Sequence, residues 1–396
     1  MRTKFALLAV LMASSTSLRA GELRTDEIAS KAVGKTLKVN VLLPDGHGAD
    51  DRRFPVVYLL HGYAGDYSQW QKIGIEKEAA GLPVILVMPD GGNSFYVNHH
   101  EDPQGKWDEY ITQELIAHVD SKYRTVPERS SRAISGLSMG GYGALMLGFR
   151  HPELYAAVAS HSGAVSVPGT SVQGEIAEQI SKIFGPPGSE TRKSYDLVAS
   201  IEALPKEKRP ALYLDCGSRD FLLEWNRNLV RKLSELKLDY EYREVPGGHD
   251  FGYWKANVRY SLERQLEALA KARAEKDAAP KVASPTPKGT GEIAGEWDLI
   301  VTYNEENLDY KLRIEGQGES MAAILVSPRS GEHRFEKIVW KEGALHMEIL
   351  RDVGGNTAKF LYDGKLSDGA LDGTVTVEGF DQFQGTWKAK RRAEEL

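Results

Sequence analysis

Short apolar runs alternate with longer amphipathic stretches over the first 270 residues of the chain. Continuous apolar runs occur at 54–60, 83–88, 132–135, 156–159 and 211–214. Runs of this length suit strands that are covered on both faces. Helical spacing of apolar residues marks three stretches between them, at 107–123, 140–150 and 225–236. The alternation predicts an α/β domain with a mostly parallel sheet.

After residue 292 the pattern changes to closely spaced candidate strands. Turn signals such as Gly354-Gly355-Asn356 and Ser367-Asp368-Gly369 lie between them. The candidate strands are 296–303, 308–314, 321–326, 335–340, 344–350, 358–362, 371–377 and 385–389. This spacing predicts an antiparallel all-β domain over residues 293–396, either a barrel or a sandwich. The sequence assigns it no role.

Residues 274–292 separate the two patterns. This segment is rich in Ala, Pro and Lys, and Pro280, Pro285 and Pro287 lack the backbone donors that helices and sheets need. We therefore predict an exposed linker here, with an α/β domain over residues 21–273 before it.

The first twenty residues have the features of a secretory signal peptide. Arg2 and Lys4 precede the apolar run 5–13, which is too short to span a bilayer, and small and polar residues follow it. A buried N-terminal helix is the alternative. We expect cleavage after Ala20 or near Ser17, and a secreted or periplasmic protein without a membrane span.

Composition excludes several classes of protein. The 396 residues are 41% hydrophobic and 27% charged, which is ordinary for globular domains and excludes wholesale disorder. The formal net charge is −6 and no basic stripe stands out, so we expect no nucleic-acid partner. The single cysteine, Cys216, allows neither an internal disulfide nor a cysteine-based metal site, and we expect no metal or cofactor.

The strongest chemical signal is the segment Gly136-Leu137-Ser138-Met139-Gly140. It follows an apolar run and opens a stretch with helical spacing, which is the strand–turn–helix context of a nucleophile elbow. The glycines avoid clashes at the sharp turn, and the helix N-terminus places free N–H groups near the serine. A structural glycine-rich turn is the alternative reading. We predict that Ser138 is the nucleophile.

A serine nucleophile needs a base and an acid that follow it in the order Ser, acid, His. His249 lies in a glycine-rich loop near the end of the α/β domain, and is better placed than the other candidate bases, His61, His99, His100 and His161. Asp220 follows the apolar run 211–214 and is our predicted acid. Asp215 is expected inside that strand and Glu224 on the next helix.

An oxyanion hole requires two backbone donors. One is expected from Met139, the residue after the nucleophile. The loop His61-Gly62-Tyr63 follows an earlier strand, and Tyr63 is the expected second donor, with an ordinary strand-end turn as the alternative. Residues predicted to line an apolar substrate pocket are Trp70, Tyr96, Trp107, His161 and Trp254, although core packing is the other reading for these aromatics.

Taken together, these segments resemble the esterase D family of α/β-hydrolases over residues 34–270. The landmarks are LLHGYAGDYSQW (59–70), NSFYVN (93–98), WDEYITQELIAHVDSKY (107–123), GLSMGGYGAL (136–145), CGSRDFL (216–222) and GGHDFGYW (247–254). The resemblance implies an α/β-hydrolase fold, catalytic Ser138, Asp220 and His249, and oxyanion donors at Tyr63 and Met139. The closest similarity is to secreted feruloyl esterases and general carboxylesterases. The C-terminal β domain departs from the minimal family pattern.

We therefore expect a secreted serine carboxylesterase that works through an acyl-enzyme, with feruloyl or acetyl esters of plant polysaccharide as candidate substrates. Two alternatives stay open. One is an acyltransferase of the mycolyltransferase type, which uses the same triad with a different acceptor. The other is a non-catalytic protein that binds carbohydrate or lipid. The sequence does not indicate the oligomeric state.

Overall fold

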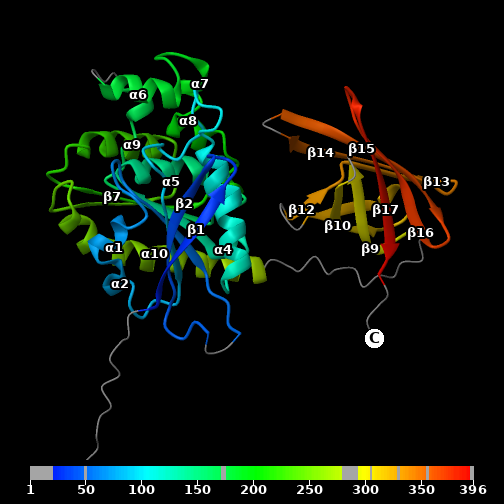
Figure 1. The fold of residues 1–396 in the computed structure, drawn as a ribbon, viewed down its shortest axis with the longest axis horizontal. Coiled ribbons are helices and arrows are strands. Elements are labelled where there is room, and N and C mark those ends of the chain that lie inside the picture. The colour runs from blue at the N-terminus through cyan, green and yellow to red at the C-terminus, as the bar shows by residue number, and fades with distance from the viewer. Residues whose placement is uncertain are drawn as a thin grey trace, which may run out of the picture. The chain divides into compact units, whose positions relative to one another are not determined.

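A computed structural model describes residues 21–48, 51–170, 175–278, 293–303, 306–327, 331–353 and 356–392. The chain divides into two compact units, Met1–Ala278 and Ala279–Leu396 (Figure 1). The predicted signal peptide and most of the predicted linker lie outside the described residues. No helix in the described part of the chain combines the length and the apolar character needed to cross a membrane.

The first unit is built on a mixed sheet of eight described strands in the order β1-β2-β4-β3-β5-β6-β7-β8. β1 and β2 form an antiparallel hairpin, β2 pairs antiparallel with β4, and all later pairs are parallel. The bounds are β1 Leu23–Ser30, β2 Lys35–Leu42, β3 Val56–Leu60, β4 Ile85–Pro89, β5 Arg132–Leu137, β6 Ala157–His161, β7 Ala211–Gly217 and β8 Glu241–Val245. The mostly parallel sheet that the sequence predicts is confirmed.

Helices cover both faces of this sheet (Figure 1). Side chains alternate along β3: Val57 and Leu59 face one core cluster, and Val56, Tyr58 and Leu60 face the other. The helix bounds are α1 Gln69–Ile73, α2 Ile75–Glu78, α3 Trp107–Glu109, α4 Ile116–Lys122, α5 Met139–Arg150, α6 Glu175–Phe184, α7 Glu190–Lys193, α8 Leu197–Glu202, α9 Leu223–Glu235 and α10 Phe251–Ala278. Burial on both faces explains why the strands are nearly continuous apolar runs.

The structure refines one sequence prediction in this unit and corrects another. The stretch 107–123, whose spacing predicts a helix, is helical over residues 107–122, with a π-helical segment, Tyr110–Leu115, between α3 and α4. The linker does not begin at residue 274, because α10 continues to Ala278. Residues 274–278, AEKDA, contain neither Gly nor Pro, so nothing in them stops a helix before Pro280.

The second unit is one antiparallel sheet of nine described strands in the order β12-β11-β10-β9-β17-β16-β15-β14-β13. The sheet curls as a half-barrel (Figure 1). Every second side chain of β9, Trp297, Leu299 and Val301, is buried in the core of this unit. The bounds are β9 Gly295–Tyr303, β10 Glu306–Glu315, β11 Ala322–Ser327, β12 Gly331–Arg334, β13 Lys337–Lys341, β14 Ala344–Val353, β15 Asn356–Ser367, β16 Ala370–Val377 and β17 Phe380–Arg391. The predicted all-β domain is confirmed.

Candidate active site

Ser138 lies at a sharp turn between β5 and α5. Its φ of 55° and ψ of −116° are unusual for a residue with a side chain, and its N–H donates to the His161 carbonyl at 2.9 Å. A strained backbone of this kind persists only where the surroundings hold it. The turn therefore presents the Ser138 hydroxyl at the carboxyl end of the central strands, as the sequence predicts for a nucleophile elbow.

Two glycines make this turn possible. A Cβ at Gly136 would lie 2.2 Å from the Gly140 carbonyl oxygen, and a Cβ at Gly140 would lie 2.5 Å from the Leu60 carbonyl oxygen. Both clashes are with backbone atoms, which cannot rotate away. The glycines of the motif are therefore required by close backbone approach.

The structure brings the three predicted catalytic side chains together. His249 Nε2 lies 3.0 Å from Ser138 Oγ, and His249 Nδ1 lies 2.9 Å from Asp220 Oδ2 and 3.0 Å from Oδ1. His249 follows β8, and Asp220 follows β7. This is the hydrogen-bonded order of nucleophile, base and orienting acid that activates a serine.

Asp220 is held in its ionised form. Burial raises the pKa of this carboxyl, but the hydrogen bonds from His249 and from the Leu222 N–H, at 2.8 Å, outweigh burial and leave the pKa below its usual value. An ionised Asp220 accepts a hydrogen bond from the Nδ1–H of His249, which leaves the Nε2 lone pair facing Ser138.

The other candidate acids are occupied elsewhere. Asp215 is buried inside β7, where it contacts His161 Nδ1 at 2.8 Å and accepts a hydrogen bond from the Tyr253 hydroxyl at 2.9 Å. Glu224 lies on α9 and pairs with Arg227 at the surface. Cys216 is buried, and burial raises the pKa of its thiol to about 12, so it is unreactive.

Three successive backbone N–H groups in the loop after β3 differ in whether they have a hydrogen-bond partner. The Gly62 N–H donates to Gln69 Oε1 and the Ala64 N–H donates to Asn93 Oδ1, both at 2.7 Å. Within the described part of the chain, the Tyr63 N–H between them has no hydrogen-bond partner. Met139 begins α5, so its amide likewise has no partner within the helix. Two unpartnered donors thus flank the nucleophile.

His61 fixes the direction of the Tyr63 amide. The Gly91 N–H donates to His61 Nε2 at 2.8 Å, so Nδ1 carries the ring proton and donates to the Gly62 carbonyl at 2.8 Å. That carbonyl belongs to the same peptide unit as the Tyr63 N–H and points the opposite way. A Cβ at Gly62 would lie 3.4 Å from Ser138 Cβ, so this peptide packs directly against the elbow.

The residues predicted to line a substrate pocket are core residues instead. Trp70 donates from its indole to the Leu60 carbonyl, Tyr96 packs over Gly143, and Trp107 belongs to the main core. His161 is fully buried beside Asp215. Trp254 is also buried, and the centroid of its ring lies 5.0 Å from that of His249 in edge-to-face geometry, so it packs against the base. These side chains fill the space between sheet and helices.

Sequence reasoning missed three residues at this site. Gln69 and Asn93 hold the loop that carries the Tyr63 amide. Phe221, between buried Asp220 and Leu222, is 76% exposed although its ring lies 4.5 Å from the His249 ring. Asn93 is part of the NSFYVN landmark. A sequence motif alone does not show that this side chain accepts a hydrogen bond from a loop about thirty residues away in the sequence.

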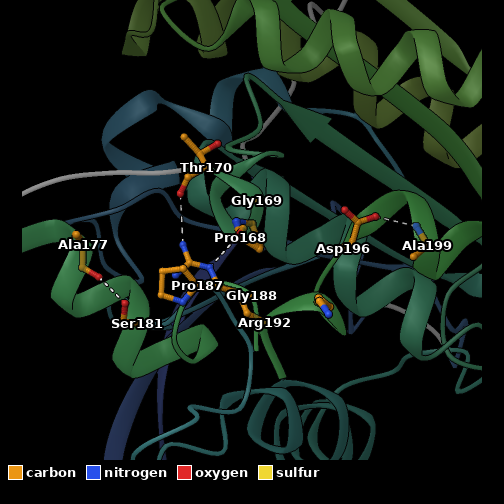
Figure 2. A pocket seen from close by; sticks show the side chains of 11 residues that line it. Pro168, Gly169, Thr170, Ala177, Ser181, Pro187, Gly188, Arg192, Asp196 and Ala199 are labelled. Atoms are coloured by element: carbon orange, nitrogen blue, oxygen red, sulfur yellow. Dashed lines mark hydrogen bonds between the residues drawn. The ribbon is translucent and has the colours of Figure 1, made fainter. Parts of the chain in front are cut away.

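Residues of α6, α7 and α8 line a cavity of about 560 Å³ (Figure 2), and no residue of the triad is among its lining residues. Ala177 and Ser181 of α6 line it, whereas Gln179, which accepts from the Tyr63 hydroxyl, lies on the opposite side of that helix. Arg192 spans the cavity wall and donates to the Pro168 and Thr170 carbonyls (Figure 2). Its guanidinium therefore braces the surrounding loops.

No cluster of three or more His, Cys, Asp or Glu able to hold a metal occurs in the part of the chain that the structure describes.

Comparison with known families decides the class of this arrangement. The sequence model of the Esterase family, described as "Putative esterase", matches residues 30–263, which is more than half of the chain and includes the elbow, Asp220 and His249. The chain belongs to this esterase family. It is an ester-hydrolysing serine hydrolase, and the esterase D resemblance seen in the sequence is confirmed.

Individual relatives agree with this assignment. An acetyl esterase of Caldicellulosiruptor saccharolyticus is 31% identical over 224 residues, covering 54% of this chain and 84% of the relative. Esterase Rv1288 of Mycobacterium tuberculosis is 30% identical over 247 residues, and the match spans only about half of its length, 54%. A solved ferulic acid esterase superposes with a TM-score of 0.54 at 25% identity, covering 63% of this chain and all of that structure.

Proposed function

We propose that the protein is exported and hydrolyses feruloyl or acetyl esters of plant polysaccharide through an acyl-enzyme on Ser138. The observation that carries the catalytic part is the continuous chain from Ser138 Oγ through His249 to Asp220, with the unpartnered Tyr63 and Met139 amides beside it. The acetyl esterase and ferulic acid esterase among its relatives support the substrate class.

In this proposal, Ser138 Oγ attacks the ester carbonyl carbon while His249 Nε2 takes its proton. The Tyr63 and Met139 N–H groups stabilise the negative charge that develops on the carbonyl oxygen. The imidazolium, stabilised by Asp220, then protonates the departing alcohol, and an acyl-Ser138 ester remains. Water activated by His249 attacks that ester, and the carboxylic acid leaves.

A series of ester substrates tests the proposal. Turnover is measured on p-nitrophenyl acetate, methyl ferulate and acetylated xylan, and the site is labelled with a serine-directed phosphonate before peptide mass spectrometry. The expected results are a phosphonate adduct on Ser138 and turnover of the natural-type esters as well as the activated one. A labelled enzyme that turns over only p-nitrophenyl acetate would overturn the substrate class but not the serine chemistry.

Export rests on Arg2 and Lys4 before the apolar run 5–13. Mass spectrometry of the protein recovered from the native host outside the cytoplasm should therefore find a new N-terminus between residues 17 and 22. Recovery of the protein from the cytosolic fraction with Met1 intact would contradict export.

A further inference from the structure

Phe221 is exposed to a degree that packing does not explain. It is 76% exposed, more than any other large hydrophobic residue whose side chain the structure describes, and it lies between two buried residues, Asp220 and Leu222. Burial of a phenylalanine side chain stabilises a fold, and an outward-pointing ring forgoes most of that stabilisation. An exposed aromatic ring at a site of chemistry is more simply explained by what it contacts during the reaction.

The ring stands beside the catalytic base. Its centroid lies 4.5 Å from that of the His249 imidazole, with an angle of 50° between the planes. The imidazole also packs in edge-to-face geometry with buried Trp254, with 5.0 Å between the ring centroids. The base thus contacts one aromatic ring that is buried and one that is largely exposed to solvent.

The reaction places one part of the substrate next to this base. His249 Nε2 must come within about 3 Å of the alcohol oxygen to protonate it as it leaves. The carbons attached to that oxygen then lie within a few ångströms of the imidazole. The centroid of the Phe221 ring lies 4.5 Å from that of the imidazole, so these carbons come within reach of Phe221. The acyl group extends in a different direction, because the carbonyl oxygen is held at Tyr63 and Met139.

We propose that Phe221 forms the alcohol subsite of this esterase and selects alcohols that carry a ring with an apolar face. This inference rests on the proposed function and adds the identity of the group that Phe221 contacts. A ring can cover the exposed phenylalanine face with its own apolar face while its polar substituents stay at its edge in water. Both an aryl ring and the C–H face of a sugar ring have this chemistry.

The same subsite receives any alcohol that acts as acyl acceptor, since deacylation retraces the path of the leaving group. The acceptor oxygen bonds to the acyl carbon, its proton passes to His249 Nε2, and the bond to Ser138 Oγ breaks as that oxygen regains the proton. The products are a new ester and free Ser138. The ratio of acyl transfer to an added alcohol over hydrolysis by water therefore measures how well the subsite binds that alcohol. It does so independently of the acylation step.

The test compares acetate esters that share one acyl group and differ in the alcohol: ethyl acetate, benzyl acetate and the 6-O-acetyl ester of methyl glucoside. Phe221→Ala should lower kcat/KM for at least one of the ring-bearing esters by about five- to tenfold relative to ethyl acetate. Acetyl transfer to benzyl alcohol or methyl glucoside should fall by a similar factor relative to transfer to methanol. The two ring-bearing arms distinguish an aryl-binding from a sugar-binding subsite.

Two variants separate a subsite from simple support of the base. Phe221→Leu keeps an apolar side chain against His249 but has no flat ring, so it should lose ring selectivity to the same extent as Phe221→Ala. Phe251→Ala removes an exposed ring that packs on Trp254 instead, at 5.9 Å, and should leave selectivity unchanged. An equal loss on all three esters in the Phe221 variants would overturn the subsite. Absence of turnover of all three acetate esters in the wild-type enzyme would instead overturn the proposed acetyl-ester activity, and the subsite with it.

Discussion

Ser138 has a strained backbone whose N–H and carbonyl groups are both hydrogen-bonded. Its carbonyl accepts the Ala164 N–H at 3.0 Å and its N–H is bound by the His161 carbonyl, so both backbone groups are fixed before substrate arrives. Its side chain is then free to exchange its proton with His249. Preorganisation of this kind lowers the barrier because no reorganisation is needed during the reaction.

Substitutions in the triad should therefore remove catalysis without unfolding the chain. Ser138→Ala and His249→Ala should each lower kcat by about 10⁴-fold or more, and Asp220→Asn should cost less but still orders of magnitude, because the acid only orients and stabilises the base. Steady-state kinetics on a soluble ester measure this, with circular dichroism as the check on folding. Turnover near the wild-type rate in Ser138→Ala would refute the assignment.

Asn93 offers a test of the oxyanion loop that leaves the triad untouched. Asn93→Ala removes the acceptor that fixes the Ala64 N–H and so loosens the neighbouring Tyr63 amide. We expect kcat to fall by about tenfold or more with little change in KM, since the lost interaction acts in the transition state. Asn93→Asp keeps an oxygen acceptor at the same position and is the matched control. A drop of the same size in both variants would argue against a role in holding the loop.

The site shows how far single residues can be predicted. The three side chains that the structure brings together, Ser138, Asp220 and His249, could be predicted from their order in the chain. This works because the end of a buried strand is recognisable from its apolar run. The direction of an aromatic side chain is not encoded in the same way. Trp70 in α1 and Tyr96 in a turn are buried in the core, whereas Phe221 is exposed.

At the level of elements, the end of α5 is tied to the start of α3. His151, which follows α5, contacts Asp108 at 2.7 Å through Nε2 and Glu153 at 3.5 Å through Nδ1. Burial lowers the pKa of His151, but these two carboxylates outweigh burial and raise it to about 9. A charged His151 therefore links two helices on one face of the sheet.

This link should make stability depend on pH. The folded-state pKa of about 9 exceeds the ordinary value of 6.5, so the stabilisation is complete below about pH 6.5 and is lost as pH rises through 9. We expect the free energy of unfolding of the wild-type protein to exceed that of His151→Gln by up to about 3 kcal/mol near pH 6, and the difference to shrink towards pH 9.5. Urea unfolding at several pH values measures it. In Asp108→Asn most of the pH dependence should vanish; a difference that stays constant from pH 6 to 9.5 would refute the link.

Elements buried on both faces were the most predictable part of the fold. The five apolar runs before residue 215 correspond to β3 to β7, since a strand covered by helices leaves an unbroken apolar signal. The hairpin β1–β2 was missed because β1 is half exposed and carries polar residues between its buried positions. The short strand β12, Gly331–Arg334, has no apolar residue at all and owes its place to pairing with β11.

On the scale of the whole molecule, each unit has its own core. Two clusters of buried hydrophobic side chains lie within residues 28–269, and a third lies within residues 293–389. No described cluster draws members from both units. A unit with a complete core can fold without its neighbour.

The triad, both oxyanion donors and Phe221 all precede residue 250, so the first unit should work alone. The helix α10 fixes where such a chain must end: Leu269 is buried in the core, and Lys276 forms an ion pair with Glu128 at 2.7 Å. A protein ending at Ala278 should therefore fold and hydrolyse a small soluble ester within about tenfold of the full-length rate, which is a barrier change below about 1.4 kcal/mol. The same comparison on acetylated xylan shows whether the β unit helps to bind a polymeric substrate. If it does, the truncated protein should have a higher KM for the polymer and an unchanged kcat on the small ester. A truncated protein that is soluble and monodisperse but inactive on the small ester would show that the chemistry depends on the β unit, and would refute the separation of the two units.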